Sequence, residues 1–209
     1  PTSSSSCGIT PDSGMMKSER AIKAMLAVDR ADFTSTRPYE DRPQAIGSHA
    51  TISAPHMHAA ALEHLSEQLL NGARALDVGS GSGYLTAAMA IMAGANGRVV
   101  GIEHMEALVN ASERNVAKHH EALLRSGRVR FVVGDGREGY EEAAPYDAIH
   151  VGAAAPEVPK KLLEQLADGG RMLIPVGKIY QQFMQIDRIG DRFEKRRLFD
   201  VSYVPLTSQ

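Results

Sequence analysis

The sequence predicts an α/β fold with a doubly wound, mostly parallel sheet that an antiparallel hairpin closes at its C-terminal edge. Between Ala73 and Val176, short apolar runs alternate with stretches of helical periodicity. This alternation is typical of β-α-β units, whose parallel sheet is covered on both faces. A glycine-rich turn, Gly79 to Gly83, follows the first apolar run, as in sheets that bind a ligand where a strand meets a helix.

The chain before the sheet predicts two helices separated by a long loop. Helical periodicity begins after Ser18, a suitable N-cap, and places Ile22 and Met25 on one face. The periodicity disappears from Asp29 to Ser53, which is longer than most structureless connections and therefore a candidate functional loop. A second helix is expected from Pro55 to Leu70.

Five strands and three helices are expected in the middle of the chain, followed by two strand-like runs that flank Gly190-Asp191. Counting those two, the sheet has seven strands. The expected strands are Ala73 to Val78, Arg98 to Glu103, Val129 to Gly134, Tyr146 to Val151 and Arg171 to Val176, with the hairpin between Phe183 and Pro205. The expected helices are Tyr84 to Ala93, Glu106 to His119 and Val158 to Leu166.

Composition predicts one folded domain in a reducing compartment. The chain has 209 residues, 43% hydrophobic and 23% charged, which are ordinary globular values. Its formal net charge of -2 provides no positive field for phosphate backbones, so we expect no nucleic-acid partner. The single cysteine, Cys7, excludes an intramolecular disulfide. No apolar run approaches the ~20 residues that cross a membrane, and residues 1–14 lack a signal-peptide core. We therefore expect a cytosolic protein with no membrane partner.

We expect residues 1–17 to be a mobile N-terminal segment and residues 18–209 to be a single domain. Within that domain, residues 18–72 would form a helical cap, 73–177 the ligand-binding core and 178–209 the C-terminal hairpin.

The glycine-rich turn favours one ligand class. Gly79, Gly81 and Gly83 stand two apart, whereas dinucleotide sites favour G-x-G-x-x-G. Asp77, two residues before the first glycine, would repel a pyrophosphate but can hold the cationic amino acid portion of S-adenosylmethionine. A glycine-rich turn without a ligand is the alternative.

Acidic residues also end the next two strands. Glu103 can accept from both ribose hydroxyls of an adenosine ligand, in NAD and S-adenosylmethionine enzymes alike. Asp135, between Gly134 and Gly136, can accept from an adenine amino group. Each acid alone is more often a helix cap or a solvated turn. At three successive strand ends, together with the glycines, they favour a nucleoside site.

Six segments resemble the protein-L-isoaspartate (D-aspartate) O-methyltransferase family, and the resemblance extends from Ser18 to Thr207. The glycine-rich turn is shared by many methyltransferases, whereas the run from Thr51 to Met57 and the ending at Thr207 are specific to this family. The segments are Ala50 to Met57, Asp77 to Gly83, Val133 to Gly136, Pro145 to Ala154 apart from His150, Gly169 to Val176, and Tyr203 to Thr207.

The resemblance implies a Rossmann-like methyltransferase that uses S-adenosylmethionine. The family methylates the free α-carboxylate of L-isoaspartyl residues, and less readily D-aspartyl side chains, in damaged proteins and peptides. The ester then cyclises to a succinimide, which begins repair. By resemblance Ser53 is the catalytic residue, and we expect a monomer that holds no metal. The expected cofactor-binding residues are Ala50, Thr51, Ile52, Ser53, His58, Asp77, Gly79, Ser82, Gly83, Glu103, His104, Asp135, Gly136 and Thr207.

The chemistry explains why the motifs contain no general base. A carboxyl group with a pKa near ~3.9 is already ionised at neutral pH, so Ser53 orients the carboxylate rather than deprotonating it. Ser53 can alternatively be the N-cap of the helix that begins at Pro55. His56, His58 and His64 can suggest a metal site, but neighbours two apart on a helix point to different sides and no paired carboxylates accompany them, so a structural or cofactor-edge role is expected.

Three rival functions stay open at this point. The chain can be a methyltransferase for a small carboxylate, a protein that binds damaged chains without repairing them, or, more remotely, an NAD oxidoreductase. The sequence also contains Asn71-Gly72 and Asn96-Gly97, dipeptides that favour succinimide formation, so an aged preparation is predicted to become its own substrate.

Overall fold

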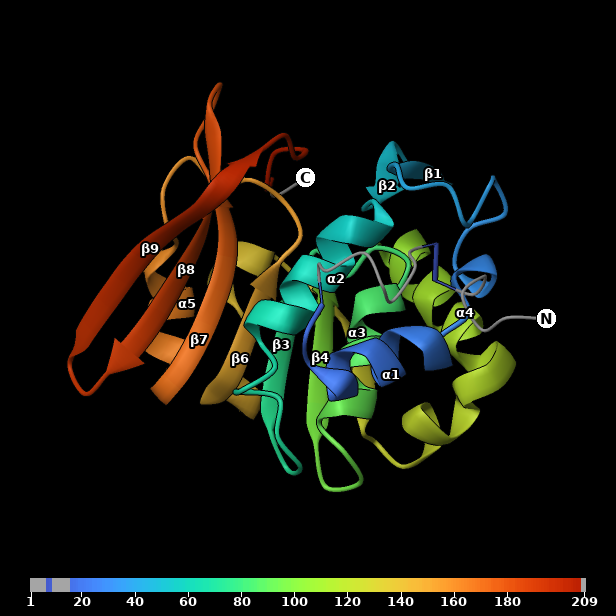
Figure 1. Cartoon of the computed structure of the whole chain (residues 1–209), viewed down its shortest axis with the longest axis horizontal. Helices are drawn as coiled ribbons and strands as arrows, with labels where there is room; N and C mark the ends of the chain where they lie inside the picture. The colour runs from blue at the N-terminus through green and yellow to red at the C-terminus, as the bar shows by residue number, and fades with distance from the viewer. Residues whose placement is uncertain (1–6, 9–15, 208–209) are drawn as a thin grey trace.

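A seven-stranded sheet with helices on both faces forms the body of the computed structural model, which describes residues 7–8 and 16–207 (Figure 1). The strand order is β5-β4-β3-β6-β7-β8-β9, parallel from β5 to β7 and antiparallel beyond. The strands are β3 Arg74–Val78, β4 Arg98–Glu103, β5 Val129–Val133, β6 Tyr146–Val151, β7 Leu166–Val176, β8 Gln181–Ile189 and β9 Arg192–Val201. The predicted fold class is confirmed.

Five α-helices and a small hairpin surround this sheet in the described residues. The α-helices are α1 Glu19–Ala27, α2 Pro55–His64, α3 Tyr84–Met92, α4 Glu106–Arg125 and α5 Lys160–Gln165. A two-stranded sheet pairs β1 Gln44–Gly47 with β2 Ala50–Ile52, and the short 3-10 helices are η2 Arg30–Asp32, η3 Gly136–Glu138 and η4 Glu141–Ala143.

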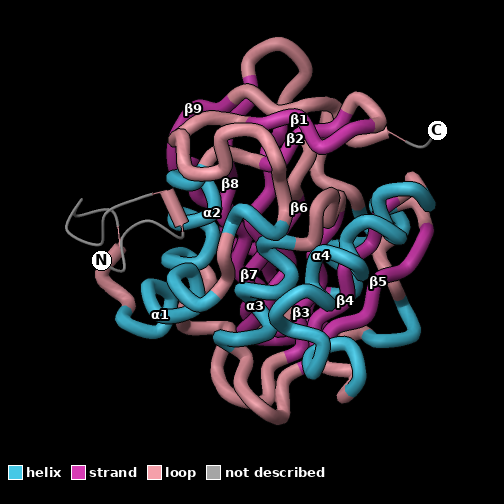
Figure 2. The backbone as a smooth tube through the Cα atoms, turned by 90° about the vertical axis from the view of Figure 1, so that its right-hand side faces the viewer, coloured by secondary structure: helices cyan, strands magenta, loops and turns pink. Residues whose placement is uncertain are grey.

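Alternating strand residues divide the core into two layers. Ala75 packs with residues of α1, α2, α3 and α4, whereas its neighbour Leu76 packs on the other face with Leu162 of α5. Figures 1 and 2 show α1, α3 and α4 together on one side of the sheet. Strands β3, β4 and β6 are covered on both faces and are mostly apolar and buried, since side chains alternate between the two faces.

The strand order reverses between β3 and β6. The chain runs from β3 outward through β4 to β5, then returns to place β6 on the other side of β3. Loops on the two sides of such a reversal separate and leave an opening at the carboxyl ends of the strands. The end of β3, where the glycine-rich turn begins, therefore lies at the opening.

Several element boundaries differ from those expected. The long loop is not structureless, because it contains η2 and the β1–β2 hairpin, so the N-terminal region is not purely helical. The second helix ends at His64 rather than Leu70, although Leu65 and Leu69 remain buried through a following turn. Helix α4 continues to Arg125 beyond a non-helical His120. Helix α5 is shorter than predicted, beginning at Lys160 rather than Val158.

Other local predictions are confirmed. Ser18 caps α1, its hydroxyl accepting from the amide of Ala21 at 3.3 Å. Pro55 occupies the first turn of α2. Strands β8 and β9 form the antiparallel hairpin around Gly190.

The two Asn-Gly turns lie side by side. The amide of Gly72 donates to the carbonyl of Ala93 at 2.9 Å, and the amide of Asn96 donates to the side-chain oxygen of Asn71 at 3.5 Å. The amide of Gly97 donates to the carbonyl of Gly94 at 3.2 Å. Both glycine nitrogens are thus hydrogen-bonded.

Most of the N-terminal segment expected to be mobile, residues 1–6 and 9–15, lies outside the described residues. Cys7, within that segment, is 3% exposed and packs into the core beside α1 and α2. Over residues 7–8 and 16–207, no helix is long and apolar enough to cross a membrane.

Candidate functional site

A buried carboxylate marks the opening between β3 and β6. Asp77 is 1% exposed and is the register partner of His150 across these strands. Its two oxygens contact different partners: Nδ1 of His150 lies 2.9 Å from one, and the hydroxyl of Thr86 donates to the other at 2.6 Å. Because both partners offer hydrogens to the carboxylate, Asp77 is fixed as an acceptor at the base of the site.

The glycine-rich turn wraps over this carboxylate. The amide of Gly79 donates to the carbonyl of Ile102 at 2.8 Å, which ties the turn to the end of β4. Gly83 precedes α3 with a φ of 86°, and a Cβ there would lie 2.9 Å from both Phe131 and Ser112. Any larger residue would therefore push the turn away from the sheet.

Glu103 connects the end of β4 to the same turn. One carboxylate oxygen accepts from the amide of Gly81 at 3.2 Å. The other accepts from the amide of Met105 at 3.3 Å and lies 2.9 Å from Nδ1 of His104. Glu103 is 5% exposed, so its carboxylate is positioned before any ligand arrives.

Asp135 and Gly136 form the outer end of the site. Asp135 caps η3 and pairs with Arg137 at 2.6 Å, and this hydrogen bond lowers the pKa of the carboxyl group. A Cβ on Gly136 would lie 2.4 Å from Val78, so only glycine fits. Leu206 also lies beside Gly136, which brings Thr207, the next residue, to this end of the sheet.

Ser53 lies between β2 and α2, and the expectation that it caps the helix is wrong. The N-cap of α2 is Ala54, without a side-chain capping bond, because the helix begins one residue later. The hydroxyl of Ser53 instead lies near the phenol of Tyr203, where it acts to lower the pKa of the phenol. Burial raises the pKa of Tyr203 to about 12, so the phenol is protonated at neutral pH.

One pocket brings half of the predicted residues together. It lies between the β2–α2 connection and the ends of β3 and β6. Of the predicted set it is lined by Thr51, Ile52, Ser53, His58, Asp77, Gly79 and Ser82, and otherwise by Ser80, Gly81, Tyr84, Leu85, His150 and Gly152. Gly83 follows in the same turn, Ala50 precedes Thr51 in β2, and Glu103, His104, Asp135, Gly136 and Thr207 lie along the neighbouring strand ends as described above.

Sequence reasoning missed three residues at this site. His150 stands inside the buried run of β6, and a lone histidine between Ile149 and Val151 was a usable indication. Tyr203 falls within the last segment of the family resemblance. Arg30 had no such indication, because its place beneath Ser53 depends on how the long loop folds back.

Histidines do not gather into a metal site. His56 pairs with Asp41 at 2.8 Å on the surface, whereas His58 is buried. In the part of the chain that the structure describes, no group of three or more His, Cys, Asp or Glu side chains could hold a metal ion.

Comparison with known proteins identifies the family. The model of the family described as protein-L-isoaspartate(D-aspartate) O-methyltransferase matches residues 9–209. The chain belongs to this family. It is 59% identical to a protein-L-isoaspartate O-methyltransferase from Caenorhabditis elegans, over 92% of this chain and 86% of the relative. A relative of the same name from Triticum aestivum is 53% identical, over 94% and 87%.

The fold of the family agrees with this structure. A Plasmodium falciparum protein described as a protein-L-isoaspartate O-methyltransferase, solved in complex with S-adenosyl-L-homocysteine, superposes with a TM-score of 0.88. It shares 38% identity, and the match covers 94% of each chain. The chain is therefore a methyltransferase that depends on S-adenosylmethionine, as predicted.

The residues present fit this cofactor. The backbone at Gly83 and Gly136 approaches its neighbours so closely that a Cβ would clash, which keeps the turn and the strand ends bare. Asp77 and Glu103 place carboxylates at the ends of adjacent strands, suited to the ammonium group and the ribose hydroxyls respectively. Asp77 already has two partners, so its remaining lone pairs would serve the cofactor directly or through water.

Proposed function

We propose that this chain methylates the free α-carboxylate of L-isoaspartyl residues, and less readily D-aspartyl side chains, in damaged proteins and peptides. One observation supports this most strongly: Ser53, which does not cap α2, lines the same pocket as Asp77 and the glycine-rich turn. A hydroxyl group and an adenosine-type site thus meet in a pocket that needs no metal and no strong base.

The proposed mechanism relies on positioning. The substrate carboxylate is ionised at neutral pH, since its ordinary pKa is about 3.9. Ser53 donates a hydrogen bond to one carboxylate oxygen, which directs the other along the line of attack. Bound S-adenosylmethionine supplies an electrophilic methyl group. Alignment of two bound reactants is worth up to ~7 to 11 kcal/mol in favourable cases, so orientation alone can account for a large rate increase. The methyl ester then cyclises to a succinimide, and hydrolysis returns part of the chain to aspartate.

We assign the cofactor to the strand ends as predicted from sequence. Asp77 faces the amino acid portion, Glu103 the ribose and Asp135 the adenine. The supporting residues are Ala50, Thr51, Ile52, Ser53, His58, Gly79, Ser82, Gly83, His104, Gly136 and Thr207.

The wider context is also a proposal. We infer that residues 18–209 act as one domain, as a monomer in the cytosol, on protein and peptide partners rather than on nucleic acid. The net charge of -2 and the single cysteine support this inference.

A labelled-methyl assay tests the function. Two peptides identical except for isoaspartate or aspartate at one position are incubated with the protein and labelled S-adenosylmethionine, together with a D-aspartyl version and free small carboxylates. We expect strong label on the isoaspartyl peptide, weak label on the D-aspartyl peptide and none on the aspartyl control. Equal labelling of isoaspartyl and aspartyl peptides, or labelling of small carboxylates alone, would contradict the proposal.

A further inference from the structure

A buried arginine lies directly behind Ser53. Arg30 is 0% exposed. It donates from Nη2 to the carbonyl of Ser53 at 2.7 Å, and Nη1 lies 3.3 Å from Nδ1 of His58. Its guanidinium lies 5.7 Å from the centre of the Tyr84 ring. Burial lowers the pKa of Arg30 to about 10, which leaves it protonated at neutral pH.

This cation is costly to bury, and among the described residues no ion pair joins it to a carboxylate, although the more distant charge of Asp41 acts to raise its pKa. Its Nε also has no hydrogen-bond partner there. A carbonyl, an imidazole and an aromatic ring therefore hold a positive charge immediately beneath the pocket. A buried charge without a directly paired carboxylate, next to a pocket, is a candidate for a functional role.

Arg30 determines which nitrogen of His58 carries the proton. A guanidinium can only donate, so Nδ1 of His58 must accept, and a neutral ring then has its proton on Nε2. Burial, followed by the charge of Arg30, holds the pKa of His58 well below its usual range, which keeps the ring neutral. The ring stacks on Tyr84 at 4.8 Å between centroids. Its remaining donor is Nε2–H, and His58 lines the pocket.

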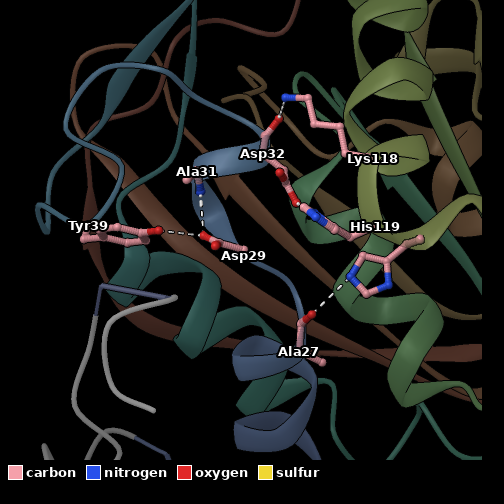
Figure 3. A network of polar contacts seen from close by, with 8 residues as sticks. Ala27, Asp29, Ala31, Asp32, Tyr39, Lys118 and His119 are labelled. Atoms are coloured by element: carbon pink, nitrogen blue, oxygen red, sulfur yellow. Dashed lines mark hydrogen bonds and ion pairs between the residues drawn. The ribbon is translucent and has the colours of Figure 1, made fainter. Parts of the chain in front are cut away.

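The backbone that carries Arg30 is anchored on both sides (Figure 3). Asp29 accepts from the amide of Ala31 at 2.9 Å and from the hydroxyl of Tyr39 at 2.8 Å. The next acid, Asp32, contacts Nδ1 of His119 at 2.6 Å, and its carbonyl accepts from Lys118 at 2.6 Å. Helix η2 is therefore fixed to α4 and to the following loop, which holds the backbone of Arg30 in place.

We propose that Arg30 is a positioning residue: it fixes the backbone of Ser53 through its carbonyl and sets the Nε2–H tautomer of His58, so that the Ser53 hydroxyl and the His58 Nε2–H together form a seat for a carboxylate. This rests on the proposed function for its substrate. A carboxylate can come from the isoaspartyl residue or from the methionine portion of the cofactor, and the experiment distinguishes them.

The seat acts on binding rather than on the chemical step. As the methyl group is transferred, the attacking carboxylate loses charge, so a positive environment stabilises the bound reactant at least as much as the transition state. Loss of the seat therefore raises KM or Kd more than it lowers kcat.

The first measurement is the tautomer itself. In protein with ¹⁵N-labelled histidine, the two imidazole nitrogens of His58 are assigned by comparison with His58→Gln, and protonated and unprotonated nitrogens are distinguished. We expect Nε2 protonated and Nδ1 unprotonated in the natural chain, and a loss of this preference in Arg30→Met. A protonated Nδ1 in the natural chain would overturn the proposal.

The second measurement separates the two carboxylates. Arg30→Lys keeps the charge but cannot reach both acceptors, and Arg30→Met removes both bonds. We expect a rise of about 10- to 100-fold in the peptide KM if the substrate is seated, or in the Kd of S-adenosylhomocysteine if the cofactor is, with a smaller change in kcat. Unchanged KM and Kd in folded Arg30→Met would overturn the proposal.

Arg128→Lys is the matched control. Arg128 also donates a single guanidinium bond to a backbone carbonyl, that of Ala90 at 2.7 Å, and its buried Nε also has no partner. It lies just before β5, away from the pocket. We expect similar losses of thermal stability in the two lysine variants but altered KM or Kd only at Arg30. Equal kinetic effects in both would reduce Arg30 to a structural role.

Substitutions of His58 keep the proposal testable if the Arg30 variants do not fold. Glutamine places an N–H donor near the position of Nε2, whereas asparagine places its amide near Nδ1. His58→Gln is expected to retain more affinity than His58→Asn, and the reverse order would contradict the assigned tautomer. If the natural protein methylates no isoaspartyl peptide, the proposed function fails, while the tautomer and the S-adenosylhomocysteine Kd still decide the role of Arg30.

Discussion

At the residue scale, the polar side chains of the site are held by neighbours rather than by solvent. Asp77 is fixed by His150 and Thr86, and Ser53 is held at its carbonyl by Arg30. Such bonds place donors and acceptors before ligands bind, so little reorganisation is needed during the reaction.

Ser53→Ala is expected to lower turnover far more than cofactor affinity, because the lost hydrogen bond orients the attacking carboxylate. A loss of about 10- to 100-fold in kcat is expected from one hydrogen bond to a charged group. Steady-state kinetics with the isoaspartyl peptide, and calorimetry with S-adenosylhomocysteine, measure the two effects. A kcat equal to that of the natural chain in folded Ser53→Ala would show that Ser53 does not orient the substrate.

Glu103→Ala is expected to weaken S-adenosylhomocysteine binding by ~1.5 to 3 kcal/mol, the scale of a charge-assisted hydrogen bond. Glu103→Gln keeps an oxygen for the Gly81 amide and controls for collapse of the turn. Calorimetry on both variants separates ribose contact from support of the turn. Unchanged affinity in the alanine variant would exclude a ribose contact.

Acid is expected to destabilise the protein through His58. Burial first, and then the charge of Arg30, keep the pKa of His58 in the folded chain well below 6.5. Below pH 6.5 the unfolded chain therefore binds a proton at His58 that the folded chain does not bind. The free energy of unfolding therefore falls with falling pH by up to about 1.4 kcal/mol per unit for this residue.

Urea unfolding between pH 7.5 and 5 measures this slope. His64 contributes in the same direction, because burial and then Arg196 lower its pKa, so His64→Gln is the companion variant. We expect His58→Gln to flatten the slope even when His64 is present. An unchanged slope in that variant would show that folding does not lower the pKa of His58.

At the scale of elements, glycines determine how closely the turn and the helices approach the sheet. Gly83 and Gly127 both have positive φ, 86° and 70°, but only Gly83 has close neighbours around the position of a Cβ. Alanine substitutions at these two glycines therefore distinguish the cost of backbone strain, which both share, from the cost of a steric clash, which only Gly83 would have.

Gly127→Ala is expected to cost ~1 to 2 kcal/mol of stability from left-handed strain alone. Gly83→Ala should cost more, because its Cβ also meets Phe131 and Ser112 at 2.9 Å, and it should weaken cofactor binding. Denaturant melts and calorimetry on both variants test this. Equal stability losses would mean that the neighbours of Gly83 move aside freely.

The β1–β2 hairpin shows why some elements escaped prediction. Its strands are three or four residues long, and its turn places Ser48 and His49 at φ values of 51° and 57°, without the Asn-Gly pair that usually indicates such a turn. By contrast, the parallel strands and their helices were predicted because each buries a long apolar pattern. Long-range packing, rather than local preference, forms the hairpin.

At the scale of the whole molecule, topology joins what the sequence separates. The acids at the ends of β3, β4 and β5 were predictable, because parallel strands end at one edge. The pairing of Asp77 with His150 was not, because it depends on β6 lying beside β3 in a particular register. The same is true of Arg30, which reaches Ser53 only after the chain doubles back.

The outer edge of the sheet bears on the assembly of the protein. Among the described residues strand β9 pairs with β8 alone, and its exposed residues include four bases, Arg192, Lys195, Arg196 and Arg197, against two acids, Glu194 and Asp200. A net excess of positive charge on an edge strand opposes pairing with the same edge of another copy. We therefore expect sedimentation at 22.5 kDa from micromolar to tens of micromolar protein at moderate salt. A dimer over this range would contradict the proposed monomer.

The paired Asn-Gly turns determine how readily the protein itself forms isoaspartate. Cyclisation requires the nitrogen of Gly72 or Gly97 to reach the preceding side-chain amide, yet both nitrogens donate to backbone carbonyls, and the side-chain oxygen of Asn71 is also engaged. Spontaneous damage at these positions must therefore wait for the turns to open. In an enzyme that methylates isoaspartyl residues, the two dipeptides that form isoaspartate most readily are thus protected by the fold. The rate at which they are damaged then depends on how often local unfolding opens these turns.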